Sequence, residues 1–165
     1  MLKTKTNMRM MVGMALLLIM GNVHAANDAG TVKTAKGVAK IVRDGKNIAA
    51  KPGSEILVSD KVTTGANSSI GITLRDGTLL SAGANSTLVL NKFILEDNGK
   101  GGLDASLQRG TLAVISGKLS KTSSDAVSYR TPTAILGVRG TEFVMEAGSA
   151  ENLYAAIFRL LISMV

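Results

Sequence analysis

Short runs of alternating hydrophobicity, separated by turn dipeptides, constrain the fold of this chain more than any other feature. Ile70, Ile72 and Leu74 alternate with small or polar residues, as expected for a strand that buries one face. Between such runs lie dipeptides that tolerate the positive φ angles of hairpin turns, namely Asp44-Gly45, Asp76-Gly77 and Asn98-Gly99. The pattern predicts an all-β fold with about ten to twelve short strands between Lys36 and Met145.

Two arrangements of these strands are compatible with the sequence. Gly65, Gly71, Gly77 and Gly83 are six residues apart, a spacing found in parallel β-helices. No aliphatic residue recurs with them at a fixed position, which favours glycines that merely fall in successive hairpins. We therefore expect a sandwich, with a solenoid-like β stack as the alternative. The run at 112–115 is apolar on both faces and predicts a strand that is covered on both sides.

The first 25 residues have the layout of a secretory signal peptide. Lys3, Lys5 and Arg9 precede the apolar run at 10–20, and Val23 and Ala25 precede the expected cleavage site. An uncleaved membrane anchor is the alternative. A helix of eleven residues, however, rises only ~16 Å, against a hydrocarbon core of ~30 Å. We expect export, with the periplasm favoured over the cell surface or the medium, and no membrane span after cleavage.

Composition excludes several kinds of active site. The chain has no Cys, and its one His, His24, lies inside the expected signal peptide. The exported chain would then lack the residues of Ser-His-Asp and Cys-His sites and the usual zinc or copper ligands. Its formal charge would fall from +7 to +4 with the loss of Lys3, Lys5 and Arg9. We expect no cofactor, no metal and no nucleic-acid partner, the last because no clustered basic face is evident.

The C-terminal residues change in character. The segment 153–165 carries a single charged side chain, Arg159, and its Leu, Ala and Ile content favours a helix too short to span a bilayer. We expect a short terminal helix packed on the sheet. The alternative is that another sequence, produced for example by a frameshift, replaces the natural end of the domain. The expected organisation is a signal peptide at 1–25, a leader at 26–35, a β domain at 36–146 and an apolar helical tail at 147–165.

Several short sequence motifs occur in a characteristic order. They are GVAKIV at 37–42, GSEIL at 53–57, SDKVTTG at 59–65, SSIGITLRDGT at 68–78, GANS at 83–86, LQRG at 107–110, SGKL at 116–119 and TPTAILGVRGTEF at 131–143. Together they resemble the FecR domain, a module of bacterial envelope proteins, over about Gly37 to Met145. Ser59 stands where the family pattern normally has Gly, and Ala84 stands where its G-P-N-S turn has Pro.

The resemblance implies an extracytoplasmic, non-catalytic module for signalling or protein binding. In the best-known FecR regulators, a cytoplasmic segment and a membrane helix precede this domain and control a sigma factor. Here only a signal peptide is expected ahead of the domain, so that mechanism is not carried over. The family usually continues with further β structure after the GTEF strand, whereas this chain turns to Gly148 and the apolar tail.

Candidate binding residues come from the last of these motifs, TPTAILGVRGTEF at 131–143, which we call the signature turn. They are Thr131, Pro132, Gly137, Arg139, Gly140 and Thr141. The guanidinium of Arg139 lies between two glycines that allow sharp bends, and it could grip a carboxylate or a phosphate. The alternative is structural: Arg139 pairs with an internal acid such as Glu142 or Asp76, or with loop carbonyls.

Catalysis is not expected. Glu142 and Glu146 would face the same side of one strand about 13 Å apart, which exceeds the separation that glycoside hydrolysis requires. Glu96 and Asp97 adjoin the Asn98-Gly99 turn, and we expect both side chains to be exposed to solvent. We expect a module that binds another envelope protein or relays a signal by contact. The alternatives are a module that binds envelope glycan or peptidoglycan, although few aromatic residues are present for stacking, and a structural component of a surface protein.

Overall fold

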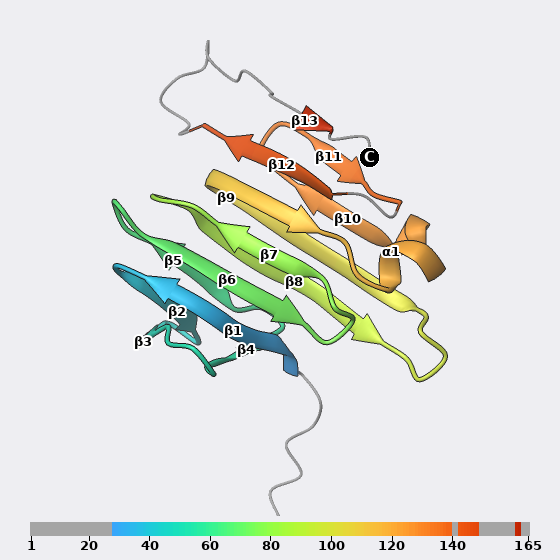
Figure 1. Ribbon diagram of the computed structural model, residues 1–165, viewed down its shortest axis with the longest axis horizontal. Helices are drawn as coiled ribbons and strands as arrows, with labels where there is room; N and C mark the ends of the chain where they lie inside the picture. Colours follow the sequence, from blue (N-terminus) through green and yellow to red (C-terminus); the bar gives the residue numbers. More distant parts are fainter. Residues whose placement is uncertain (1–27, 140–141, 149–160, 163–165) are drawn as a thin grey trace, which may run out of the picture.

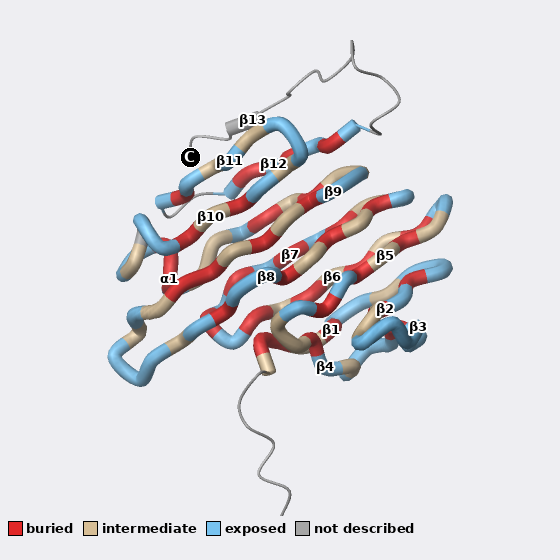
Figure 2. The backbone as a smooth tube through the Cα atoms, turned by 180° about the vertical axis from the view of Figure 1, so that it is seen from behind, coloured by how far each residue is buried: buried red, intermediate tan, exposed pale blue. Residues whose placement is uncertain are grey.

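The computed structural model describes residues 28–139, 142–148 and 161–162, so the expected signal peptide lies outside the described residues. Thirteen strands in the described residues form one sheet, which folds over at its longest strand, β9 (Gly101–Ile115), into two layers. The strands of these layers overlap in both views of the backbone (Figures 1 and 2). The prediction of an all-β fold is confirmed.

We call the layers sheet A and sheet B, and β9 contributes its C-terminal half to the first and its N-terminal half to the second. In spatial order, sheet A has β4 (Glu55–Leu57), β1 (Asp28–Lys36), β6 (Ser69–Leu74), β7 (Leu79–Ala82), β9, β12 (Glu142–Ala147) and β13 (Leu161–Ile162). Sheet B has β3 (Lys46–Ala49), β2 (Ala39–Arg43), β5 (Lys61–Thr64), β8 (Thr87–Leu95), β9, β10 (Val127–Arg130) and β11 (Ile135–Gly137). The helix α1 (Leu119–Thr122) and the 3-10 turn η1 (Ser124–Ala126) connect β9 to β10.

The arrangement is a sandwich. Within the described residues, neighbouring strands pair antiparallel except β9 and β10, which are parallel. A solenoid-like β-helix would stack parallel strands instead. The six-residue glycine spacing has no common structural meaning, since Gly71 lies inside β6 and Gly77 lies in the loop after it. The strands β2 to β12 begin between Lys36 and Met145, and these eleven agree with the predicted number.

One hydrophobic core lies between the layers. Ile70, Ile72 and Leu74 are buried while the residues between them are partly exposed, as period two requires. Buried and exposed positions alternate along the strands (Figure 2). The ring of Tyr129 in sheet B meets that of Phe143 in sheet A edge to face, with centroids 5.1 Å apart and planes at 72°. This contact ties the two layers together.

The dipeptide Arg109-Gly110 is not a turn but the place where β9 passes from sheet B to sheet A. From Leu103 to Leu107 the buried positions of β9 are odd-numbered, and from Leu112 onward they are even-numbered. Gly110, with φ of +90°, lies where this change occurs. A glycine is needed there because a Cβ would lie 2.6 Å from the Cα of Ser86. The Ser86 hydroxyl holds the bend by accepting a hydrogen bond from Thr111 N at 3.1 Å.

The expected leader at 26–35 is wrong in its described part, because residues 28–35 belong to β1. This strand pairs with both β4 and β6, and it buries Ala29 and Val32 in the core. Its pairing with β6 shifts register between Val32 and Thr34. That irregularity breaks the period-two pattern by which a strand is recognised from sequence.

The expected C-terminal helix is also wrong where the tail is described. Ala147 belongs to β12, and Leu161–Ile162 form β13, which pairs antiparallel with Phe143 and Val144. The open backbone groups of an edge strand offer hydrogen bonds that outweigh a weak helix propensity. The rest of the expected helix, at 149–160 and 163–165, lies outside the described residues.

Ser59 occupies a backbone conformation that favours glycine. Its φ is +73°, and its N–H donates to the carbonyl of Leu90 at 2.7 Å, which holds the turn against β8. The other non-glycine residues with positive φ in the described chain are Asp or Asn, which tolerate the left-handed region. Ser59 is therefore the strained member, at the position where the family pattern has Gly.

We predict that Ser59→Gly stabilises the protein by about 1 kcal/mol, because glycine adopts this φ without the penalty of a Cβ. The side chain of Ser59 is exposed, so little contact is lost. Denaturant unfolding should show a higher midpoint with an unchanged slope. Asn67→Gly, at φ of +54°, is the control and should leave stability nearly unchanged. A lower midpoint for Ser59→Gly would contradict the prediction.

Candidate functional site

The first part of the signature turn closes a hairpin between β10 and β11. Thr131 N donates to Ala134 O at 2.8 Å, and Ala134 N donates back to the Thr131 hydroxyl at 3.1 Å. Pro132 occupies the exposed tip, where its missing N–H leaves no ladder bond unmade. Thr131 and Pro132 therefore lie together in this hairpin turn, and the Thr131 hydroxyl is used as an acceptor within the turn.

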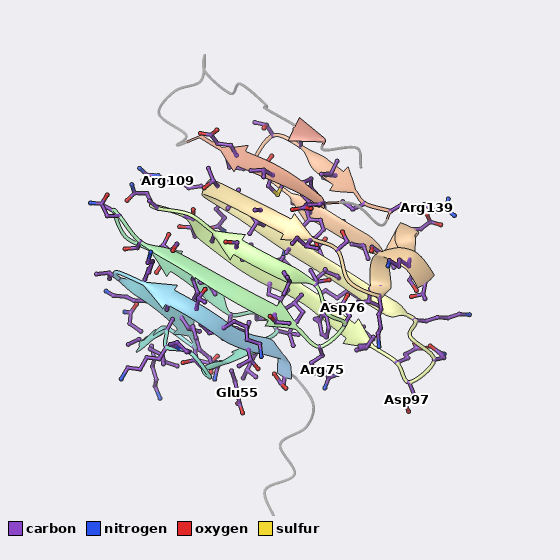
Figure 3. All side chains as sticks on the ribbon, in the orientation of Figure 1. Glu55, Arg75, Asp76, Asp97, Arg109 and Arg139 are labelled. Carbon is purple, nitrogen blue, oxygen red and sulfur yellow. The ribbon has the colours of Figure 1, made fainter. Side chains whose placement is uncertain are left out.

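The second part of the signature turn leaves the sheet. Gly137 ends β11 with open space where a Cβ would be, Val138 is buried, and Arg139 is exposed. Gly140 and Thr141 lie outside the described residues. Arg139 and Asp76 lie well apart in Figure 3, so Asp76 is not the internal acid that the structural alternative required.

Asp76 instead holds a buried corner between sheet A and α1. Its carboxylate accepts hydrogen bonds from the hydroxyl of Thr78 at 2.8 Å and from the amides of Thr78 at 3.0 Å and Leu119 at 3.4 Å. Burial, followed by the charge of Asp76, raises the pKa of Tyr129 above its usual range. The Tyr129 hydroxyl is buried without a partner in the described chain. Both groups therefore read as structural.

A second buried carboxylate, Asp60, grips Arg43 through two nitrogens. Arg43 Nε donates to Oδ1 at 2.9 Å and an Arg43 terminal nitrogen donates to Oδ2 at 2.8 Å. Asp60 Oδ2 also accepts from Leu57 N at 2.8 Å. Hydrogen bonding to Asp60 raises the pKa of Arg43, although desolvation opposes the shift. This pair pins β2 and the turn before β5, and it also serves structure.

A polar network lies on the outer surface of sheet B. Asp104 accepts from Asn91 at 2.6 Å, Ser128 at 2.5 Å and Arg130 Nε at 2.6 Å. The same Asn91 amide donates to Ser106 at 2.5 Å. Partial burial would raise the pKa of Asp104, but these hydrogen bonds and the charge of Arg130 hold it below its ordinary value. The carboxylate is therefore a fixed anion beside an exposed guanidinium.

An open pocket of about 480 Å³ adjoins this network at the β8–β9 hairpin. Its walls include Lys92 and Lys100, the acids Glu96 and Asp125, and the hydroxyls of Thr122 and Ser123. The aliphatic chain of Lys92 lies over Gly102, where a Cβ would be 3.3 Å from the ammonium nitrogen. Because acids and bases line the pocket in equal number, its lining has no strong preference for either sign of charge.

The outer surface of sheet A carries an apolar patch, which we define as Leu79, Ala113, Ile115 and Val144. Leu79 pairs directly with Ile115, and Ala113 pairs directly with Val144, so the four side chains are neighbours across three strands. Ile115 is 46% exposed. The expectation that the strand at 112–115 is covered on both sides is therefore wrong within the described structure.

Two glutamates border the apolar patch. Glu142 and Glu146 lie on the same face of β12 as Val144, as the sequence predicted, and both are exposed. Glu142 is opposite Ile115, and Glu146 is opposite Thr111. The arrangement is an apolar centre with an acidic rim.

Sequence reasoning missed both surfaces. It concentrated on the signature turn, while the network around Asp104 and the apolar patch are assembled from three strands each. One signal was available: Val144 between Glu142 and Glu146 places an aliphatic residue on an otherwise acidic strand face. The neighbours Leu79 and Ile115 are 36 residues apart and could not be connected without the strand order.

Comparison with known proteins identifies one family. The family model described as FecR protein matches residues 60–158, more than half of the chain. The match begins after the first of the family-like motifs, which starts at Gly37. It continues beyond Met145, into the segment that was expected to depart from the family. No curated protein and no solved structure matches the chain. No helix in the described residues is long and apolar enough to cross a membrane.

Proposed function

Because the chain belongs to the FecR family, which acts in envelope signalling, we propose that it is an exported, non-catalytic module that signals by contacting another envelope protein. The observation that carries this proposal is the apolar patch on sheet A. An apolar centre surrounded by polar side chains is the usual anatomy of a protein contact. Solvent-exposed aliphatic residues that adjoin one another favour such a role more than residues scattered singly.

The rim indicates the chemistry of the partner. Glu142 and Glu146 place two negative charges beside aliphatic side chains on an exported chain whose formal charge would be +4. A partner that complements this surface presents aliphatic side chains flanked by Lys or Arg. The charge pairs would guide orientation and association rate, while the apolar side chains would supply most of the affinity.

Site-directed photo-crosslinking tests the proposal. The chain has no cysteine, so Ile115→Cys creates a single attachment point for a thiol-reactive benzophenone at the apolar patch. After illumination with an envelope fraction, the labelled protein should give one discrete crosslinked protein, identified by mass spectrometry. An excess of unlabelled wild type should suppress that product. An unlabelled Ile115→Asp variant should not, because a buried carboxylate would oppose docking.

The matched control is Ile48→Cys, since Ile48 is 40% exposed and lies in β3 at the other end of the sandwich. A product that forms equally from both positions, or from neither, would count against the apolar patch as the contact. Export is tested separately by fractionation and intact mass. A periplasmic species that begins at Ala26 is expected, and a cytoplasmic full-length chain would contradict the proposed location.

The signature turn is a second candidate contact in this proposal. Its residues are Thr131, Pro132, Gly137, Arg139, Gly140 and Thr141. Two of them close an exposed hairpin, and the exposed Arg139 suits an acidic group. We expect unlabelled Arg139→Ala to suppress crosslinking less than unlabelled wild type does, if Arg139 contributes to the contact.

A further inference from the structure

The outer surface of sheet B gathers cations that are scattered in the sequence. We call Lys40, Lys61, Lys92 and Arg130 the basic face; they come from β2, β5, β8 and β10. All four are exposed, and each lies at an outward position of its strand. In the sequence they are separated by between 21 and 38 residues, so no basic cluster is visible there. Strand pairing alone places them on one surface.

The strand register gives the spacing of the basic face. Lys61 pairs with Val89, Val89 with Ser106, and Ser106 with Arg130. These residues therefore form one row across four strands. Three strand spacings separate Lys61 from Arg130, or about 14 Å. In the adjacent row, Lys92 pairs with Asp104, and Asp104 pairs with Ser128.

The side chains between the cations are mostly small and polar. Hydroxyl groups come from Ser106 and Ser128 in these two rows and from Thr63 and Thr87 in the next row. Amide groups come from Asn91 and Gln108, at the register shifts between β8 and β9. The acid in the network, Asp104, is already bound by three donors, among them Arg130 Nε. Arg130 is 45% exposed, and in the described chain no group binds its two terminal nitrogens. They remain available as a fork for a carboxylate.

We propose that the basic face binds a linear acidic polysaccharide that carries carboxylate groups. The spaced cations would pair with carboxylates, and the hydroxyls and amides between them would hydrogen-bond to sugar hydroxyls. The inference goes beyond the proposed protein contact, which uses the opposite surface of the sandwich. Binding would hold the module at an envelope or capsular polymer while sheet A remains open.

Two other polyanions fit the surface less well. Single-stranded nucleic acid requires aromatic stacking surfaces, whereas Phe93 and Tyr129 are buried in the core. An anionic membrane would favour aliphatic or aromatic residues beside the cations, but the positions between Lys61 and Arg130 carry one aliphatic residue, Val89, and one serine.

Binding of the purified full-length chain to a polyuronate, alginate, tests the proposal by titration calorimetry at low and moderate salt. We expect saturable binding that weakens as salt rises, and no binding to neutral dextran. The double variant Lys61→Gln with Lys92→Gln should lose about tenfold in affinity, or ~1.4 kcal/mol. Replacing the same two lysines with Arg should restore binding, because the charges return.

The matched control is Lys33→Gln with Lys36→Gln, which removes the same charge from β1 in sheet A. It should reduce affinity less than about twofold, while thermal unfolding confirms that both double variants are folded. Equal losses for the two would show that only net charge matters and would overturn the proposal. Absence of saturable alginate binding, or equal affinity for single-stranded DNA or for phosphatidylglycerol vesicles, would also overturn it. Ile115→Asp should leave alginate binding unchanged, so failure of the protein contact and failure of the basic face are distinguishable.

Discussion

Gly110→Ala is expected to destabilise the fold by about 4 kcal/mol, a large part of the stability of a domain this size. Two penalties combine at this position. A side chain at φ of +90° costs ~1–3 kcal/mol, and the added Cβ would lie 2.6 Å from the Cα of Ser86. Overpacking against backbone costs a further ~1–3 kcal/mol, because the strand must move. The measurement is the free energy of unfolding in denaturant.

Gly77→Ala separates the two penalties. Gly77 has nearly the same φ, +87°, but it lies in a hairpin loop where an added Cβ would meet nothing within 4 Å. It should therefore cost only the backbone penalty, ~1–3 kcal/mol. The difference between the two variants reports the close approach of β9 to Ser86. Equal destabilisation would mean that β9 does not need a glycine to pass between the sheets.

Asp60→Ala is expected to cost about 3 kcal/mol. The carboxylate is 1% exposed, and its loss leaves Arg43 without its ion pair and Leu57 N without its acceptor. The cost exceeds the net value of the pair, because Leu57 N is left without an acceptor and Arg43, at 28% exposed, is only partly solvated. The double variant Arg43→Ala with Asp60→Ala should recover part of this loss. A double variant as unstable as the sum of the two single variants would contradict the coupling.

Asp104→Asn is the matched control, since Asp104 also pairs with an arginine but is 15% exposed. A surface pair is worth ~0–1 kcal/mol, so the loss at neutral pH should be small. The pKa of Asp104 is lowered in the folded state, so its contribution is present above the unfolded pKa and is lost as pH falls. The stabilities of wild type and Asp104→Asn should therefore begin to converge as pH falls below about 4, and they should meet only below the lowered folded-state pKa of Asp104. Divergence in acid would contradict this assignment.

The two proposed binding surfaces lie on different sheets of the sandwich. Both have one face in the common core, which leaves the outer surface of sheet A for the apolar patch and that of sheet B for the basic face. Residues that touch neither surface, such as Ser86 and Asp60, maintain the sandwich. Variants of one surface are therefore suitable controls for the other.

Local features were well predicted where the chemistry is local. Asp44-Gly45 forms the expected turn, with φ angles of +50° and +75°, between strands that pair from Arg43 and Lys46 outward. Asn98-Gly99 closes the β8–β9 hairpin, where Gly99 N donates to Glu96 O. The burial of Ile70, Ile72 and Leu74 follows from alternation alone. Strand β1 was missed because its register shift interrupts that alternation.

An all-β chain, its main hairpins, its family and its lack of cysteine all follow from the amino-acid sequence. The three-dimensional pairing of the strands makes Arg109-Gly110 a crossing within β9 and leaves Ile115 facing solvent. It also decided that four distant cations share one surface. The physical reason is that turns and alternation are set by neighbours in the chain, whereas an outer face is set by which strands pair and in which register.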